Sequence, residues 1–514
     1  MAEDRLPLRR IFAFLAMVFG MFMAILDIQI VSASLADIQA GLGASADEIS
    51  WVQTAYLIAE VIMIPLSGFL GRMLSTRVLF TVSAAGFTAA SFLCATSGSI
   101  NEMIVWRAVQ GFLGGGMIPS VFAAAFTIFP KSKQAIVSPM VGLVATLAPT
   151  IGPTIGGSLS HAFSWHWLFL VNVPFGIAVA ISAWVLIDFD KPDLRLFAKF
   201  DWWGFGAMAA FLGALQYVLE EGPGNDWLED EAVLVMAIVL LVGGAVFFWR
   251  ALTRPEPIVD LGAFRDRNFA MGSIFSFVMG VGLYGLTYLY PVFLGRIRGY
   301  DSLMIGQTMF VSGLAMFLTA PLVGILSRKV DLRLLIAVGF LGFGASTWML
   351  MGMTADWDFG ELLVPQILRG MSLMMAMVPI NNLALGTLPP ERLKNASGLY
   401  NLTRNLGGAV GLALINTILT NRGALHFERL SEAVTSSNPQ AMAQMDAMAR
   451  TLTAQGLDGQ AGAMAQMIAQ ITQQATVMSF IDVFTILACL FASLAVFALA
   501  LKRPAPREAS AAAH

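Results

Sequence analysis

The sequence predicts an all-α integral membrane protein with about fourteen transmembrane helices, arranged as two pseudo-symmetric six-helix bundles plus two inserted central helices. Composition supports this first, because only 12% of the 514 residues are charged and 57% are hydrophobic. A soluble domain has about 25% charged residues. A series of long apolar runs is the second observation, and an internal repeat is the third. Helices are expected because the runs are too long for the strands of a membrane barrel.

The apolar runs each approach or exceed the length that a helix needs to cross a bilayer, which is roughly 17–25 residues. They cover residues 11–35, 49–70, 78–95, 103–129, 135–159, 167–187, 202–219, 232–249, 269–294, 303–326, 334–353, 362–388, 396–419 and 477–501. No cleavable signal peptide is expected, because no small-residue cleavage site follows the first run. Basic residues concentrate at the N-terminus (Arg5, Arg9 and Arg10) and in every second loop, which predicts that both termini are cytoplasmic.

The repeat relates the segment from Pro65 to Arg77 with the segment from Pro321 to Arg333. PLSGFLGRMLSTR and PLVGILSRKVDLR share Pro, Leu, Gly, Leu, Arg and Arg in register, and a Gly followed by a Pro comes after each at nearly the same offset. Two similar membrane-exit loops could also arise by chance. Repeated membrane halves are the usual architecture of transporters, whose substrate site lies where the halves meet.

The runs and the repeat together predict four parts of the chain. Residues 1–187 form an N-terminal six-helix bundle, 188–268 hold the two inserted helices and their cytoplasmic linkers, 269–501 form the C-terminal six-helix bundle, and 502–514 form a cytoplasmic tail. The C-terminal bundle includes a periplasmic loop, residues 421–476, whose Met and Leu spacing predicts two short amphipathic helices. These helices either lie on the membrane or the protein, or dock a periplasmic partner.

Two carboxylates lie inside predicted spans, Asp27 in the first and Glu60 in the middle of the second. Charges in a membrane are costly, so each is a functional candidate by default. A carboxyl group in a cavity of low dielectric can hold a proton and release it when the cavity fills with water. A proton relay here must use carboxylates, because no histidine lies in a predicted span. Asp27 could otherwise be a cap or a packing partner, and Glu60 could make an interhelix hydrogen bond.

Arg107, near the start of the fourth run, either extends to the membrane interface or faces inward and acts on a nearby carboxylate. Other polar and Met residues are candidates either for lining a substrate cavity or for tying helices together: Gln29, Gln110, Met374, Met375, Asn381, Asn382, Asn401 and Arg404. Methionines mostly fill cores, but a Met-rich wall also suits a site that accepts many apolar shapes. GPTIGG in the fifth run predicts a kinked helix that packs closely on a partner.

Several of these motifs resemble signatures of the major facilitator superfamily, namely GFLGRMLSTR, WRAVQG and GPTIGG. The two inserted spans and further stretches narrow the resemblance to the fourteen-span drug:proton antiporters, and in particular to their EmrB-type multidrug permeases. These stretches are LDIQIVSASL, WHWLFLVNVPFG, PIVDLGAFRDRNF, LPPERL and NLTRNLGG. The resemblance covers nearly the whole chain.

The resemblance implies an exporter of hydrophobic or amphipathic small molecules in the bacterial inner membrane, driven by the proton gradient without a cofactor and working by rocker-switch alternating access. It also implies a tripartite pump with a periplasmic adaptor of the membrane-fusion type and an outer-membrane channel. By position, Asp27 would be the family's first-span acidic residue and Arg107 its fourth-span arginine. With Glu60, which the sequence itself makes a candidate as a carboxylate inside a span, they are the residues expected to couple to protons. The antiporter motif would be Gly152, Pro153, Gly156 and Gly157.

One departure from the superfamily pattern concerns the loop after the second span. The family's Asp, four residues after the first Gly, is replaced by Arg72 after Gly68 and by Arg328 after Gly324. These residues, with Arg77 and Arg333, are expected to act as cytoplasmic gating loops. A basic cluster at a helix C-terminus would then hold the cytoplasmic side closed.

Other functions remain open at this point, including a proton symporter for uptake of a specific solute and an exporter of one endogenous metabolite or fatty acid. An enzyme or a receptor is disfavoured, because no catalytic constellation of His, Cys or Ser lies at the membrane surface and no soluble sensor domain is present. Two cysteines and four histidines give no metal-ligand spacing, and the net charge of −3 gives no nucleic-acid surface.

Overall fold

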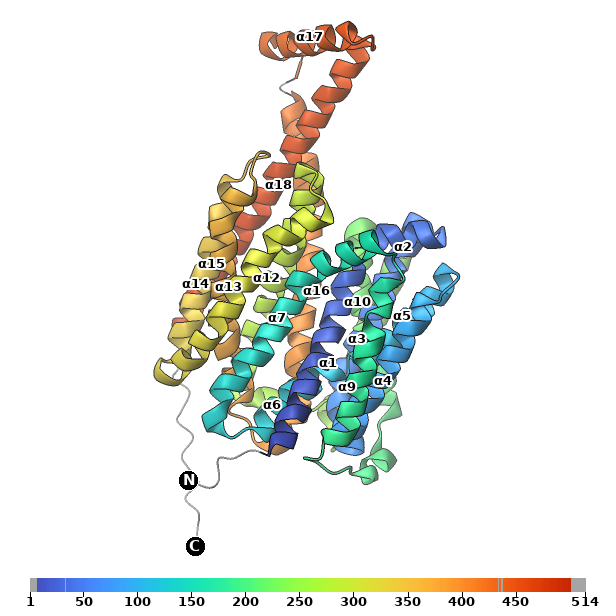
Figure 1. Cartoon of the computed structure of the whole chain (residues 1–514), viewed down its shortest axis with the longest axis vertical. Coiled ribbons are helices and arrows are strands. Elements are labelled where there is room, and N and C mark those ends of the chain that lie inside the picture. Colours follow the sequence, from blue (N-terminus) through green and yellow to red (C-terminus); the bar gives the residue numbers. More distant parts are fainter. Residues whose placement is uncertain (1–6, 33, 433, 436–437, 501–514) are drawn as a thin grey trace.

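The computed structural model describes residues 7–32, 34–432, 434–435 and 438–500. The predictions for Arg5 and for the tail 502–514 concern residues outside this part of the chain. Within the described residues every regular element is a helix, and fourteen helical segments are long and apolar enough to cross a membrane (Figure 1). The predicted fold class and number of spans are therefore confirmed.

The first half of the core holds six spans. They are α1 (Leu8–Ser32), α3 (Ala46–Leu74), α4 (Thr76–Ala95), α5 with α6 (Ile100–Gly114 and Met117–Ile128), α7 (Lys131–Ala162), and α8 with α9 (Trp167–Leu170 and Asn172–Leu186). The short α2 (Leu35–Leu42) follows α1. Ser45 begins α3 with a capping box. Its hydroxyl accepts a hydrogen bond from the Glu48 amide, and the Glu48 carboxylate accepts one from the Ser45 amide. Such a box satisfies amides that a helix start leaves unpaired.

The second half also holds six spans. They are α12 (Arg267–Arg298), α13 (Ser302–Lys329), α14 (Leu332–Met349), α15 (Phe359–Leu385), α16 (Pro390–Glu432) and α18 (Gly459–Ala500). Aspartates begin four of them, because Asp266, Asp301, Asp331 and Asp358 each accept a hydrogen bond from the first turn of their helix. Single 3₁₀ turns lie in the connections at Leu194–Lys199, Gly222–Gly224, Trp227–Glu229, Leu261–Arg265 and Leu350–Gly352.

The two halves repeat the same helix packing. In the first half α1 packs on α7, α3 on α5 and α4 on α9, and in the second half α12 packs on α16, α13 on α15 and α14 on α18. The repeated glycines fit this arrangement. A Cβ on Gly111 would lie 2.3 Å from the Tyr56 carbonyl oxygen of α3, and a Cβ on Gly370 would lie 2.3 Å from the Ser312 carbonyl oxygen of α13. The halves meet through two reciprocal pairs, α3 with α16 and α7 with α13.

The inserted helices α10 (Trp202–Glu221) and α11 (Glu231–Thr253) pack on each other, and α10 also contacts both α3 and α16. The insert therefore touches both halves beside one of the two seams between them. Arg250 of α11 donates through Nε to both carboxylate oxygens of Asp201, at 3.0 and 2.9 Å, and so ties the start of α10 to the end of α11. These hydrogen bonds hold the pKa of Asp201 below its ordinary value.

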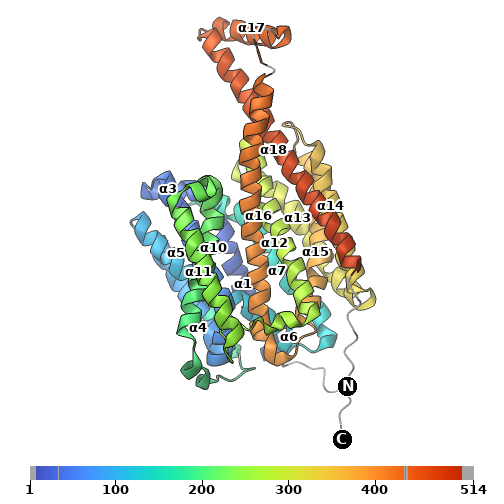
Figure 2. The same ribbon diagram turned by 180° about the vertical axis from the view of Figure 1, so that it is seen from behind.

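The two ends of the bundle differ in shape. At the end that we call the base, α1 begins and α18 ends; at the opposite end α16 and α18 continue beyond the bundle, and α17 (Pro439–Ala454) crosses their tips (Figures 1 and 2). We call this projection the stalk. The first predicted amphipathic helix is α17, whereas the second is not a separate helix but the first turns of α18. The stalk projects away from the bundle instead of lying along it.

Candidate functional site

A buried ion pair joins two spans of the first half. The Arg107 guanidinium of α5 lies 2.6 Å (Nη1 to Oδ2) from the Asp27 carboxylate of α1, and neither side chain is exposed. Arg107 also donates through Nε to the Val52 carbonyl of α3 at 3.1 Å, and its guanidinium lies 4.2 Å from the centre of the Tyr56 ring. Because Arg107 is fully buried, it faces inward and does not extend to the membrane interface.

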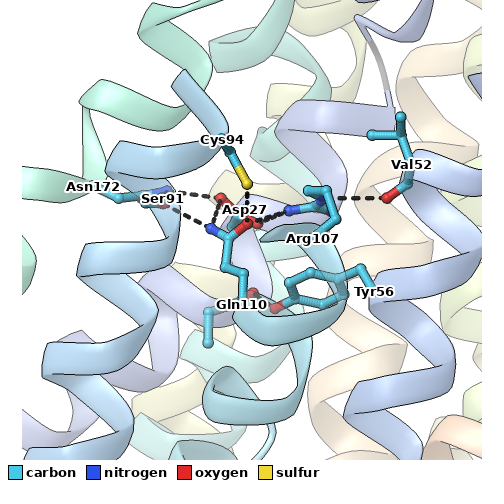
Figure 3. A network of polar contacts seen from close by, with 9 residues as sticks. Asp27, Val52, Tyr56, Ser91, Cys94, Arg107, Gln110 and Asn172 are labelled. Carbon is cyan, nitrogen blue, oxygen red and sulfur yellow. Dashed lines mark hydrogen bonds and ion pairs between the residues drawn. The ribbon is translucent and has the colours of Figure 1, made fainter. Parts of the chain in front are cut away.

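Three neutral side chains add hydrogen bonds to this pair (Figure 3), while Arg107 Nη2 is buried without a hydrogen-bond partner. Gln110 donates to Asp27 Oδ1 at 3.1 Å and accepts from Arg107 Nη1 at 2.7 Å. Asn172 of α9 also donates to Asp27 Oδ1, at 2.7 Å, and Ser91 of α4 accepts from both amides. Such hydrogen bonds offset part of the cost of burying two charges. One polar network therefore connects α1, α4, α5 and α9.

A cavity lies between the two halves, on the stalk side of the core. Two adjoining pockets of about 80 and 300 Å³ share six wall residues: Gln29, Gln53, Leu57, Glu220, Tyr284 and Leu412. The walls come from α1, α3, α7, α10, α12 and α16, so both halves and the insert contribute. The larger pocket, at about 300 Å³, reaches the lower end of the size range of small-molecule sites, roughly 300–1,000 Å³.

Glu60 of α3 lies in the wall of the smaller pocket with only 2% of its surface exposed. Its Oε1 atom is buried and has no hydrogen-bond partner. The interhelix hydrogen bond that was the alternative for this residue is therefore absent at that oxygen. A buried polar atom without a partner is costly, so this oxygen is available to a proton or to a ligand.

The second half buries an arginine that lacks an acidic partner. Arg369 of α15 is fully buried, donates to the Thr287 hydroxyl of α12 at 2.9 Å, and lies 5.2 Å from the centre of the Tyr290 ring. In the described part of the chain no carboxylate hydrogen-bonds to it, and its Nε atom has no partner. A guanidinium cannot lose its proton in proteins, so this site carries a fixed positive charge.

Among the residues predicted for proton coupling and for the substrate cavity, Gln29 and Glu60 line the cavity. The other predicted cavity residues are not in its wall: Gln110, Met374, Met375, Asn381, Asn382, Asn401 and Arg404. Gln110 belongs to the Asp27 network, and the two methionines pack in the core of the second half. The Met-rich cavity wall that the sequence suggested is therefore absent from this cavity.

The polar residues of α15 and α16 instead tie helices together. Arg404 donates to Asn401 at 2.6 Å and lies 5.2 Å from the centre of the Phe122 ring, which belongs to the first half. Tyr400 donates to Asn381 and so connects α16 with α15. Asn382 is only partly buried, near the end of α15.

The predicted antiporter motif lies where α7 crosses α1. A Cβ on Gly152 would lie 2.3 Å from the Gln29 Cβ, and a Cβ on Gly156 would lie 2.5 Å from the Ile30 carbonyl oxygen. These glycines thus permit a helix contact that any larger residue would prevent. Pro153 lines the larger pocket, and Gly157 is buried. The motif therefore positions the helix that carries Asp27.

The predicted gating arginines make their described contacts within their own half. Arg77 donates to the Ile187 carbonyl, Arg72 lies 5.5 Å from the centre of the Phe69 ring, and Arg333 pairs with Asp331 at 2.8 Å. In the second half, Gly324 and Arg328 line a groove of about 530 Å³ between α7 and α13 near the base.

Lys394 of α16 makes the contact across the halves at the base. It pairs with Asp190, which follows α9, and donates to the Gly71 carbonyl of α3 at 2.8 Å. Asp190 also accepts from the Thr76 amide and hydroxyl at 2.8 and 2.7 Å. Gly68 lies at the same crossing, since a Cβ there would lie 2.9 Å from the Lys394 carbonyl oxygen. The base side of the cavity is therefore closed by α3 against α16.

Sequence reasoning missed a histidine in a helix. His426 was placed in a loop, but it lies in α16, is 8% exposed, and has its Nε2 atom 2.9 Å from Asp482 Oδ2 of α18. The span criterion ended the helix at residue 419, where apolar residues thin out, although α16 continues to Glu432. Among the described residues, no group of three or more His, Cys, Asp or Glu side chains could hold a metal ion.

Comparisons with known proteins agree with this architecture. The chain matches the family model of the Major Facilitator Superfamily over residues 17–412. It is 42% identical to the colistin resistance protein EmrB of Acinetobacter baumannii over 95% of each chain. It is 30% identical to the multidrug export protein EmrB of Escherichia coli, covering 93% of this chain and 92% of that protein. The fatty acid resistance protein FarB of Neisseria gonorrhoeae is 31% identical over 87% of each chain.

A solved structure has the same fold at low sequence identity. The human organic anion transporter MFSD10 superimposes with a TM-score of 0.57 at 12% identity, covering 95% of this chain and all of that one. At this identity the likeness concerns the fold alone.

Proposed function

The chain belongs to the Major Facilitator Superfamily of transporters, and on that premise we propose that it is a proton-coupled multidrug efflux antiporter. Its substrates are hydrophobic or amphipathic small molecules. The proposal depends above all on the unpartnered Glu60 carboxyl oxygen in the wall of a cavity between the halves. A proton and a ligand can compete for such a position, and competition for one site is the simplest form of exchange.

Asp27 and Arg107 provide a second place for a proton. Protonation of Asp27 removes the charge that Arg107 faces at 2.6 Å, and the network through Gln110, Asn172 and Ser91 must then rearrange. Because four helices share that network, a change in one proton alters the packing of the whole first half. Gly152 and Gly156 hold α1 against α7, so a shift of α1 also reaches the seam with α13.

Alternating access follows from the closed base and the cavity on the stalk side. We take the base as the cytoplasmic side, with both termini there, because basic residues concentrate in its loops. The structure then corresponds to a state open towards the periplasm, and breaking the Lys394–Asp190 contact opens the cytoplasmic side. Rocking of two repeats around a central site is the general mode of such transporters.

We also propose that the protein is the inner-membrane component of a tripartite pump, with a periplasmic adaptor of the membrane-fusion type and an outer-membrane channel. The stalk supports this proposal, because it extends helices beyond the bundle at the end opposite the base. Co-purification of a tagged chain with the adaptor, and its loss when residues 439–454 are deleted, tests it.

Export of fatty acids is the second candidate function. The FarB relative favours it, since that protein is named for fatty acid resistance. Cavity walls rich in Leu and Tyr suit an acyl chain as well as an aromatic drug. A symporter for solute uptake would move its substrate in the opposite direction, so the direction of transport distinguishes it from drug export and from fatty acid export.

The deciding experiment uses inverted membrane vesicles with an imposed proton gradient. Addition of an amphipathic drug should release protons from the vesicles and drive drug uptake into them, and Glu60→Gln should reduce the coupled proton movement. Drug uptake without proton release, or drug movement out of the vesicles, would contradict the proposal. A fatty acid offered in place of the drug tests the second candidate in the same preparation.

A further inference from the structure

The inserted helix α10 places a second carboxylate in the central cavity. Glu220 lies near the stalk-side end of α10 and forms part of the wall of both pockets. Gln216, one turn earlier on the same helix, lines the smaller pocket beside Glu220. Because α10 packs on both α3 and α16, Glu220 is held at the seam between the halves.

The charge around Glu220 is not balanced by any basic residue of the cavity wall. Among the described residues that line the two pockets, Glu60 and Glu220 are acidic and none is Lys or Arg. Arg107 and Arg404 are close enough to attract Glu60 electrostatically, whereas the charged neighbour that acts on Glu220 is another carboxylate, Glu221. A carboxylate with no basic residue beside it in the wall favours a cation there.

The remaining wall has the chemistry of an organic-cation site. Tyr284 and Tyr288 line the larger pocket together with Leu57 and Leu412. Tyr284 donates its hydroxyl to Asn405 at 3.3 Å and Tyr288 donates its hydroxyl to Asn416 at 2.8 Å, so both rings are held in place. Aromatic faces beside a carboxylate attract cations that carry apolar groups.

We propose that Glu220 is the charge selector of the cavity and binds the positive group of an amphipathic cationic substrate, while the apolar part of that substrate packs against Leu57, Tyr284 and Leu412. The inference rests on the proposed export function, because it names the substrate class of the same cavity. It also gives the inserted pair of helices a role: α10 is one wall of the binding site rather than a spacer between the halves.

Two ions of equal size and opposite charge test this. Tetraphenylphosphonium and tetraphenylborate are titrated into the purified full-length protein in detergent, and binding is measured by calorimetry. The wild type should bind the cation about tenfold or more tightly than the anion, as expected for one nearby charge at a partly solvated site. E220Q should abolish this preference, E220D should keep most of it, and E220K should reverse it.

Glu221 provides the matched control, because it is the next residue, carries the same charge and is held by Thr54 at 3.2 Å outside the cavity wall. E221Q should keep the preference for the cation. The proposal is overturned if the wild type binds both ions equally or binds neither. It is also overturned if E220Q, in protein that elutes and unfolds like the wild type, leaves the preference unchanged. A preference that is lost in E60Q but kept in E220Q also overturns it, because Glu60 is then the selector.

The assay separates this inference from the function on which it rests. Drug-driven proton release with no charge preference rejects the selector and leaves the antiporter standing. A clear charge preference without proton release in vesicles rejects the antiporter and leaves the cation site standing.

Discussion

Both halves of the molecule bury an arginine at corresponding places, and only the first half gives it an acid. On α5, Arg107 precedes Gln110 by three residues, just before the first glycine of the repeat. On α15 the order is reversed, with Gln366 preceding Arg369 by three residues before the matching glycine. The arginine bonds to the glutamine in both halves, at 2.7 and 3.4 Å. The same pair of side chains thus occupies both helices in opposite order.

The first helix of each half supplies the partner that makes the difference. Asp27 of α1 gives Arg107 a carboxylate, whereas Thr287 of α12 gives Arg369 a hydroxyl. The first half therefore holds a pair whose net charge changes when a proton binds, and the second half holds a fixed cation. If the proposed proton coupling holds, the two halves have different roles: the first half responds to protons, and the second half keeps a constant positive charge.

The largest effect is expected when the first half is made like the second. Asp27→Asn leaves Arg107 as a buried cation without an acid, which should abolish drug-driven proton release. It should also lower the free energy of unfolding by up to about 3–5 kcal/mol, the usual cost of breaking a buried pair. Proton release in proteoliposomes and thermal unfolding of the purified protein measure the two effects.

The double variant Asp27→Asn/Arg107→Gln is the matched control, because it removes both charges. Stability should recover in part, while proton release should remain absent. If Asp27→Asn retained normal proton release, the division of labour between the halves would be wrong.

A second difference between the halves lies on the matched helices α3 and α13. In the register of the repeat, Glu60 corresponds to Met316, which is fully buried. Glu60→Met should therefore fold, since methionine fits irregular apolar surroundings. Its rate of coupled transport should fall at least about tenfold, which is the size of effect expected from removing one acid–base group. The transport rate of one drug, measured between about pH 6 and pH 8, tests the predicted loss.

Glu60→Gln sharpens the result, because it keeps the shape of the side chain and removes its proton. It should flatten the dependence of transport on pH while drug binding persists. An unchanged pH profile would remove Glu60 from the proton path.

A smaller effect is expected at the contact that joins the halves at the base. Lys394→Met removes the pairing with Asp190 and should shift the equilibrium towards a base-open state by about tenfold, since a hydrogen bond to a charged group contributes about 1.5–3 kcal/mol. A cysteine placed at Ser120, in the small pocket beside Lys394, should then be alkylated faster in a background lacking Cys489.

Lys329 of α13 is the control for this change, because it is an exposed lysine near the base. Lys329→Met should leave the alkylation rate within about twofold, as is usual for surface substitutions. Equal rates in wild type and Lys394→Met would mean that other contacts keep the base closed.

The smallest effect is expected in the insert, which belongs to neither half. The hydrogen bonds from Arg250 hold the pKa of Asp201 below its ordinary value, which is about 3.9. A carboxylate with a depressed folded-state pKa stabilises the protein above the unfolded-state pKa and loses that effect as the pH falls through the folded-state pKa. Asp201→Asn should therefore lower the melting temperature at neutral pH, and the difference from wild type should shrink below about pH 4.

Arg250→Gln completes this test, because it removes the partner from the other side. Both variants should lose similar stability at neutral pH and keep proton-coupled transport. A loss of coupling in either variant would mean that the insert takes part in the proton path.

The sequence predicted the spans and the repeat well because both depend on local patterns. An apolar run of sufficient length must cross the membrane as a helix, and repeated segments such as Pro65–Arg77 must occupy equivalent places. Asp27, Glu60 and Arg107 were identifiable because a charge within an apolar run is rare and costly. What the charges touch was not identifiable, since Asn172 lies on a distant helix and is an ordinary neutral residue by itself.

Three other features escaped prediction for physical reasons. Glu220 was overlooked because the insert looked separate from the halves, and only packing brings α10 to the seam. Lys394 was one basic residue among many in the loops, and its pairing with Asp190 depends on the fold. His426 lies beyond the apolar part of α16, where hydropathy no longer marks the helix.

The length of α16 has a mechanical consequence. This helix runs unbroken for 43 residues, about 65 Å at 1.5 Å per residue, and it carries Lys394 in its first turns and the stalk at its far end. The first turns of this helix are therefore held at the base, and its far end extends beyond the bundle. A tilt of about 5° at the base end displaces the far end of α16 by about 6 Å over that length. Opening or closing of the base would therefore move the stalk.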